Sequence, residues 1–178
     1  MSRVTRIALI AGAGAVLVLV AVRWFFWGGD GISRAAAGDC VDAAQVVDCS
    51  SAGARFKVLA VLPAAGSCAD VAGAVSFTAA GSRRVCLGPV GADPAKAVNV
   101  AKEGDCVDLD PAEPQRVACD SPDADHRVLR RLTNVPSAQT DGACREVAGA
   151  DKSYGWDLQG TDDGATVDVV LCFGPLQR

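Results

Sequence analysis

Eight cysteines in a chain of 178 residues constrain the fold more than any other feature. With only one histidine beside them, they suit an oxidised scaffold outside the cytoplasm better than a cytosolic enzyme. They also fall into two similar groups of four. Gly-Asp-Cys-Val-Asp occurs at 38–42 and again at 104–108, and Cys-x-Gly-Pro ends both groups, at 86–89 and 172–175. The sequence therefore predicts two repeats of one four-cysteine unit.

The two units differ in length because their connections differ. Unit one spans residues 38–89 and unit two spans residues 104–175, which gives 52 and 72 residues. The additional residues fall in the gaps between cysteines, where a shared fold tolerates insertions. Residues 28–37 and 90–103 are interpreted as linkers, the second with a short helix after Asp93-Pro94.

Within each unit, apolar and turn-forming residues predict mainly antiparallel strands. We expect a strand at each Gly-Asp-Cys motif, a short helix after the third cysteine, and a hairpin added to unit two at 154–158. The further predicted strands cover 46–49, 56–62 and 84–87 in unit one and 116–119, 126–132 and 167–173 in unit two. The expected fold class is α+β, with two small disulfide-stapled repeats.

Units of this size are marginal without cross-links, so the cysteines are expected to form disulfides. One scheme used within both units leaves three pairings open. We favour sequential pairing, because the first two cysteines of a unit would clamp a hairpin and the last two would pin the helix to the final strand. The favoured pairs are Cys40 with Cys49, Cys68 with Cys86, Cys106 with Cys119 and Cys144 with Cys172. No cofactor or metal is expected, since no Cys-x-x-Cys or zinc-binding spacing occurs.

The amino-terminal segment predicts a membrane anchor over residues 1–27. Ile7 to Trp27 is an apolar run of 21 residues interrupted by Arg23, long enough to span a bilayer. Arg3 and Arg6 before the run predict a cytoplasmic start and an extracytoplasmic carboxyl-terminal part. A signal peptide cleaved near Ala37 is the alternative.

Charge argues against a nucleic-acid partner. Residues 28–178 contain 14 basic and 21 acidic residues, a formal net charge of −7. Against this background, His126, Arg127, Arg130 and Arg131 form a basic cluster on a predicted strand, with Arg127 and Arg131 on one face. The cluster would either protect an edge strand or contact an anionic envelope polymer or lipid headgroup. His126 is expected to be exposed.

Tyr154 and Trp156 form the second candidate site. Their spacing places both rings on one face of a strand, where they would either fill a core or form a platform for stacking a sugar or a peptide.

The repeated Gly-Asp-Cys-Val, the Cys-Asp-Ser-Pro-Asp-Ala of 119–124 and the Val-Leu-Cys-Phe of 170–173 resemble the LppU-like family of actinobacterial envelope proteins. They are similar, more weakly, to the septum-formation domain of comparable bacteria. The resemblance covers both units and implies a surface-anchored module of poorly defined function. Several such proteins are lipoproteins, whereas this chain has no cysteine before Cys40.

These features predict a single-pass membrane protein with its repeats outside the cell. We expect a binding or scaffolding module of the envelope without catalytic activity, whose partner is an envelope protein or an anionic envelope polymer. The alternative is an extracytoplasmic thiol-disulfide or hydrolytic enzyme, which would need a reactive cysteine or a site built around His126.

Overall fold

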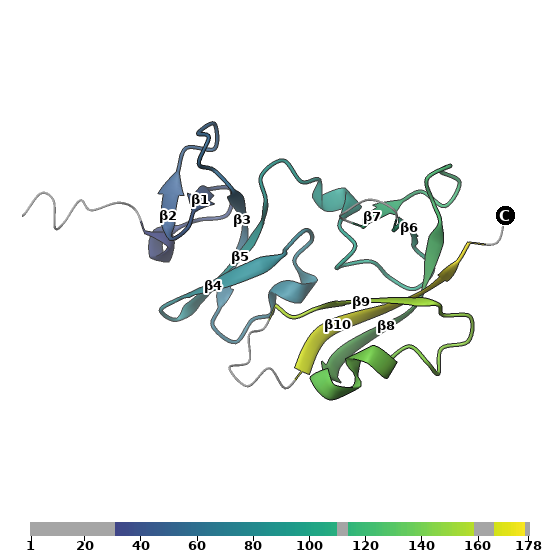
Figure 1. Ribbon diagram of the computed structural model, residues 1–178. Helices are drawn as coiled ribbons and strands as arrows, with labels where there is room; N and C mark the ends of the chain where they lie inside the picture. The colour runs from purple at the N-terminus through teal and green to yellow at the C-terminus, as the bar shows by residue number, and fades with distance from the viewer. Residues whose placement is uncertain (1–30, 110–113, 159–165, 177–178) are drawn as a thin grey trace, which may run out of the picture.

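The computed structural model describes residues 31–109, 114–158 and 166–176. They form two five-stranded antiparallel sheets, one in each unit, and the strand order is the same in both (Figure 1). The order is β2-β1-β3-β5-β4 in unit one and β7-β6-β8-β10-β9 in unit two. The predicted membrane segment, Ile7 to Trp27, lies outside the described residues. Within the described ranges, no helix is long and apolar enough to cross a membrane.

Apart from β4, which the sequence analysis did not predict, the strands lie close to the predicted positions. Those of unit one are β1 (Cys40–Asp42), β2 (Gln45–Val47), β3 (Phe56–Pro63), β4 (Ser76–Ala80) and β5 (Arg83–Pro89). Those of unit two are β6 (Cys106–Asp108), β7 (Gln115–Val117), β8 (His126–Pro136), β9 (Lys152–Trp156) and β10 (Thr166–Pro175).

The helical part of the expected α+β class is wrong, because the described residues contain 3-10 helices and no α-helix. The four are η1 (Ile32–Arg34), η2 (Cys68–Asp70), η3 (Pro94–Lys96) and η4 (Ser137–Gly142). The helix expected after Cys68 is the single turn η2, and the one expected after Cys144 is a series of turns. Gly73 and Gly149, with φ of +80° and +82°, end both segments before an α-helix could repay its nucleation cost.

The hairpin at 154–158 is not an addition to unit two. Strand β9 pairs with β10 as predicted, but β4 pairs with β5 in the same register in unit one. Phe77 lies opposite Cys86, and Ser153 lies opposite Cys172. The sequence of β4 gives a weak signal because its last two residues are alanines, which have low β propensity.

The repeated Gly-Asp-Cys motif fixes the start of each unit. Gly38 and Gly104 adopt φ of +101° and +93°, a conformation that favours glycine. The next residue, Asp39 or Asp105, accepts a hydrogen bond from a backbone N–H three residues upstream, at 2.8 and 2.9 Å respectively. The motif therefore ties the preceding segment to the first strand.

Each unit consequently begins before its Gly-Asp-Cys motif, so the interpretation of 28–37 and 90–103 as linkers is only partly right. Gly31 forms a bridge with Gln45, and Ala97 forms the equivalent bridge with Gln115. The alanine that lies four residues after this bridge, Ala35 in unit one and Ala101 in unit two, is completely buried in both units. The expected short helix after Asp93 is η3, capped by the Asp93 carboxylate, which accepts from the Ala95 N–H at 2.9 Å.

A bulge explains the other repeated motif. The pairing of β3 with β5 skips Leu59, and the pairing of β8 with β10 skips Leu129. These leucines pack over the glycine of Cys-x-Gly-Pro. A Cβ atom at Gly174 would lie 2.7 Å from Leu129 Cδ1 and 2.6 Å from the carbonyl oxygen of Gly149, and the corresponding distances at Gly88 are 2.7 and 2.5 Å. Only glycine fits beneath the bulge in either unit.

The two units share one hydrophobic core. Its buried members come from unit one, the connecting segment and unit two, including Cys68, Cys86, Val98, Val107 and Phe173. A second cluster, which includes Val41, Val58 and Val85, belongs to unit one alone. The junction between the units is therefore a packed interface.

Candidate functional site

All eight cysteines are disulfide-bonded, in the sequential pairs that the sequence analysis favoured. The first disulfide of each unit links the first strand to the turn after the second strand. The other disulfide links the segment before the edge strand to the last strand. Cα–Cα distances of 5.0 to 5.5 Å lie within the range for unstrained disulfides. No thiol is left for nucleophilic or exchange chemistry.

The arginines of the basic cluster expected on β8 are divided between the two faces of the strand. Because the bulge at Leu129 inserts one residue, Arg127 pairs with Gly174 and Arg130 pairs with Cys172, whereas Arg131 pairs with Leu171. Arg127 and Arg130 therefore share one face of the strand, and Arg131 lies on the other. The prediction that Arg127 and Arg131 share a face is wrong, since strict alternation does not hold across a bulge.

Arg130 and Arg131 also have separate partners. Arg131 donates through Nη1 to the carbonyl oxygen of Asn99 at 2.6 Å and through Nη2 to Asp70 Oδ1 at 2.9 Å. It thus links the sheet of unit two to the connecting segment and to η2 of unit one. Arg130 Nε lies 3.5 Å from Glu103 Oε1, in a pair that is more than half exposed.

His126 is buried rather than exposed, and only 7% of its surface is accessible. Its Nδ1 lies 3.0 Å from Asp125 Oδ1, and its Nε2 lies 3.5 Å from Asp151 Oδ2. The expectation of an exposed strand histidine is wrong, because the His126 ring is buried between the carboxylates of Asp125 and Asp151.

The environment of Asp125 lowers the pKa of its carboxyl group. Burial by itself would raise the pKa of the Asp125 carboxyl group. The adjacent His126 ring, the hydrogen bond from the Leu109 N–H and the positive charge of Lys152 outweigh burial and hold that pKa below its ordinary value. The surroundings of Asp125 therefore favour its ionised form.

Asn99 joins the two units. It is 3% exposed, and its amide nitrogen donates to the carbonyl oxygens of Ala69 and Val71 at 3.0 and 2.9 Å. Its Oδ1 accepts from the Gly73 N–H at 3.0 Å. Every bond of this side chain goes to the η2 segment of unit one, while its own carbonyl is held by Arg131 of unit two. This clasp fixes one unit against the other.

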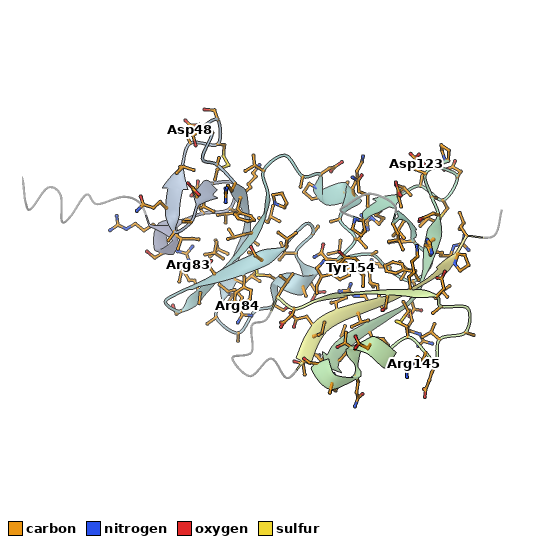
Figure 2. The ribbon with its side chains drawn as sticks, viewed as in Figure 1. Asp48, Arg83, Arg84, Asp123, Arg145 and Tyr154 are labelled. Atoms are coloured by element: carbon orange, nitrogen blue, oxygen red, sulfur yellow. A yellow bond between two sulfur atoms is a disulfide. The ribbon has the colours of Figure 1, made fainter. Side chains whose placement is uncertain are left out.

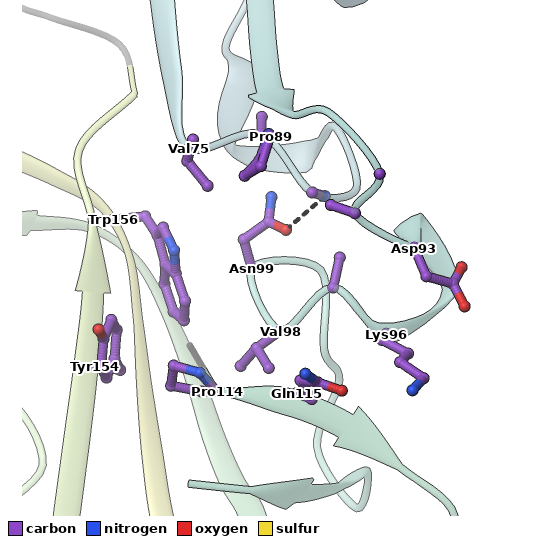
Figure 3. Close-up of a pocket in the computed structure, with 15 residues that line it drawn as sticks. Val75, Pro89, Asp93, Lys96, Val98, Asn99, Pro114, Gln115, Tyr154 and Trp156 are labelled. Atoms are coloured by element: carbon purple, nitrogen blue, oxygen red, sulfur yellow. Dashed lines mark hydrogen bonds between the residues drawn. The ribbon is translucent and has the colours of Figure 1, made fainter. Parts of the chain in front are cut away.

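Beside the clasp lies a cleft of about 540 Å³ between the two units. Unit one supplies Val75 and Pro89 to its lining, and unit two supplies Pro114, Tyr154 and Trp156. Tyr154 lies where the two units meet (Figure 2). The connecting segment completes the lining with Asp93, Lys96, Val98 and Asn99 (Figure 3).

The aromatic pair predicted from the sequence stands at one side of this cleft (Figure 3). The rings of Tyr154 and Trp156 are 5.0 Å apart at their centroids and inclined by 38°. Tyr154 is 44% exposed, while Trp156 is half-buried and packs against the shared core. The interpretation of both rings as core residues therefore fits Trp156 in part and does not fit Tyr154.

Sequence reasoning missed the other wall of the cleft. Val75 and Pro89 lie in unit one and Asn99 lies in the connecting segment, so only the docking of the units brings them near Tyr154. Asn99 could have been noticed as the polar residue between the apolar Val98 and Val100. No group of three or more potential metal ligands lies together in the described part of the chain.

The fold and the cleft define a tandem-repeat, disulfide-cross-linked β protein with one aromatic-lined site between its units. Comparisons with protein-family models, with curated proteins and with solved structures find no match.

Proposed function

We propose that this chain is a membrane-anchored, extracytoplasmic binding module of the bacterial cell envelope and that its ligand site is the cleft between the two units. The observation that carries this proposal is the exposed aromatic pair on β9. Tyr154 and Trp156 occupy the register positions that Thr78 and Ala80 hold in unit one. Unit one folds with these small residues, so the strand does not need the two rings in order to form.

The surroundings of the pair support a binding role. Val75, which lines the same cleft, is 48% exposed and is among the few large apolar side chains left accessible. An accessible apolar wall that faces accessible aromatic rings is typical of ligand-binding clefts, especially where two units meet.

The disulfides and the amino-terminal run support the location. Four disulfides in one small protein indicate an extracytoplasmic domain, because the cytoplasm keeps thiols reduced. The apolar run from Ile7 to Trp27 and the preceding arginines support an anchor with the repeats outside the membrane. The resemblance to actinobacterial envelope proteins is consistent with this placement.

Binding is favoured over the enzymatic alternative by the state of the reactive groups. All eight cysteines are cross-linked, and the single histidine is buried between two carboxylates, away from the cleft lining. A hydrolytic mechanism would need His126 beside a nucleophile in an accessible site.

Location is tested by protease treatment of bacteria that carry the full chain with a carboxyl-terminal tag. If the repeats are extracytoplasmic and anchored, protease added to spheroplasts removes the tag, and the undigested tagged chain sediments with the membrane fraction. Protection of the tag in intact spheroplasts, or release of the tagged chain into the medium, would overturn the placement.

The cleft is tested by ligand-observed NMR with a fragment library, using the full chain in detergent micelles. We expect fragments that bind the native chain and are lost with Tyr154→Ala. Val90→Ala is the matched control, since Val90 is 39% exposed but lies outside the cleft lining. The proposal fails if no fragment distinguishes the Tyr154 variant from the Val90 variant.

A further inference from the structure

We propose that the cleft binds a proline-rich peptide in the polyproline II conformation. This inference rests on the proposed function, because it names the ligand class of the same cleft. Three features carry it: the geometry of the aromatic pair, the hydrogen-bonding groups that remain available, and the apolar wall opposite the rings.

The aromatic pair has the form that proline-rich ligands use. Tyr154 and Trp156 lie two residues apart on an extended strand, with their ring planes inclined by 38° and centroids separated by 5.0 Å. Rings at this separation contact each other, and the outer face of the exposed Tyr154 ring is left for a pyrrolidine ring to stack against. Aromatic-lined grooves recognise polyproline II segments in this way, and the stiff ligand loses little conformational entropy on binding.

Two of the side-chain acceptors in the cleft are engaged within the protein. Asn99 Oδ1 accepts the Gly73 N–H, and Asp93 Oδ1 accepts the Ala95 N–H. The lining also carries donors, namely the Tyr154 hydroxyl, the Trp156 indole N–H and the Lys96 ammonium group. These donors suit a ligand that offers acceptors.

A polyproline segment has that chemistry. Proline has no N–H group, and the carbonyl groups of a polyproline II helix form no internal hydrogen bonds. A sugar presents hydroxyl groups that both donate and accept, and each one desolvated without a partner weakens binding. A polyproline segment accepts from these donors without placing an unpaired donor of its own in the cleft.

The wall opposite the rings is apolar and is continuous with the interface between the units. Val75 and Pro89 of unit one face the cleft together with Val98 and Pro114. A volume of about 540 Å³ is within the range of small-ligand sites and accommodates a short peptide segment. A ligand held there contacts both units, whose relative position the Asn99 clasp has already fixed.

The sequence offers a direct reporter for this binding. The chain has three tryptophans, of which Trp24 and Trp27 lie in the predicted anchor. In the full chain carrying Trp24→Phe and Trp27→Phe, the fluorescence of Trp156 alone reports on the cleft. We would titrate this protein, in detergent micelles, with a decaproline peptide and in parallel with chitohexaose.

Decaproline is expected to change the fluorescence saturably, and chitohexaose is not. Tyr154→Ala should weaken decaproline binding at least tenfold, and Val75→Ala several-fold. Val90→Ala, a change of the same kind outside the lining, should leave the affinity within twofold. Unchanged circular dichroism of each variant would confirm that its fold is retained.

Three results would overturn the proposal in different ways. Saturable binding of chitohexaose without decaproline, abolished by Tyr154→Ala, would replace the ligand class and leave the proposed binding function standing. Absence of a response to either probe would overturn the peptide assignment, and the fragment experiment would then decide the proposed function separately. Equal decaproline binding by the Tyr154 and Val90 variants would exclude the cleft as the binding site.

Discussion

Unit one and unit two have the same strand order, the same two disulfides and the same leucine bulge over a glycine, but they differ where they meet. Thr78 and Ala80 of unit one correspond to Tyr154 and Trp156 of unit two. Ser33 corresponds to Asn99, since each lies two residues after its bridge to the second strand. The units thus share the cysteines, glycines and bulge leucines of the common fold and differ at the residues of the junction.

Because of this difference, only one of the two units carries the residues that join it to the unit before it. Unit two presents Asn99 and Arg131 to the η2 segment of unit one. The corresponding positions in unit one are Ser33 and Val61, and neither side chain can form those bonds. The interface that joins the units is therefore not available at the start of unit one, and the aromatic cleft occurs at one place in the tandem.

The largest expected effect tests whether the second disulfide of each unit stabilises the protein by a similar amount. Loop lengths of 28 and 18 residues predict a stabilisation of about 3–4 kcal/mol from Cys144–Cys172 and slightly less from Cys68–Cys86. We expect the double variants Cys144→Ala/Cys172→Ala and Cys68→Ala/Cys86→Ala to lower the urea midpoint of unfolding by similar amounts. A large loss in one unit and none in the other would break the equivalence.

The next largest effect concerns the hydrogen bonds of Asn99 at the junction, which the corresponding residue of unit one does not form. Asn99→Ala leaves the carbonyl oxygens of Ala69 and Val71 and the N–H of Gly73 without their partner, and should cost about 2–3 kcal/mol. The exposed counterpart Ser33 provides the control, and Ser33→Ala should change stability by less than about 0.5 kcal/mol. Equal effects, measured by thermal unfolding, would show that Asn99 does not join the units.

A pH dependence of stability distinguishes Asp125 of unit two from the residue at the matched position of unit one. Because the folded-state pKa of Asp125 lies below the ordinary value of 3.8, its carboxylate stabilises the fold above that value. The contribution is lost as the pH falls through the lowered pKa. Asp125→Asn should therefore cost about 1 kcal/mol at pH 7 and progressively less as the pH is lowered below 3.8.

Arg55 is the matched position in unit one, since the N–H groups of Arg55 and Asp125 donate to Val41 and Val107 respectively. Arg55→Gln should show no such acid dependence in urea unfolding measured between pH 2 and pH 7. If the cost of Asp125→Asn stayed constant over that range, the carboxylate charge would not be the source of the stabilisation.

The smallest effect concerns the surface of β8. Arg130 and Glu103 are 58% and 55% exposed, so Arg130→Ala should change stability by less than about 0.5 kcal/mol, and salt should reduce even that. Its counterpart in unit one is Ala60, which the same bulge places opposite Cys86. A loss above about 1 kcal/mol that persists in high salt would indicate an ordered basic site on this strand.

The sequence predicts the parts of the fold that depend on covalent and periodic constraints. The repeated cysteines reveal the two units and allow the pairing to be chosen, and the apolar runs locate most strands. Tyr154 and Trp156 are recognisable as a candidate pair because their spacing places them on one strand face.

The remaining features depend on contacts that the local sequence does not encode. The bulge at Leu129 changes which arginines share a face, and it arises from the close approach of Gly174 across the sheet. His126 is buried with the carboxylate of Asp151, a residue distant in the chain, against its ring, although its flanking residues are charged. The cleft forms only when the two units dock, so the sequence of one unit does not reveal which residues of the other unit line it.

The central claim is that this chain contains two copies of one disulfide-cross-linked β unit. Peptide mapping of the purified full chain by mass spectrometry, after alkylation without reduction, tests it most directly. We expect four linked pairs, Cys40–Cys49, Cys68–Cys86, Cys106–Cys119 and Cys144–Cys172, and no alkylated cysteine. A disulfide between a cysteine of unit one and a cysteine of unit two, or a free thiol in either unit, would contradict it.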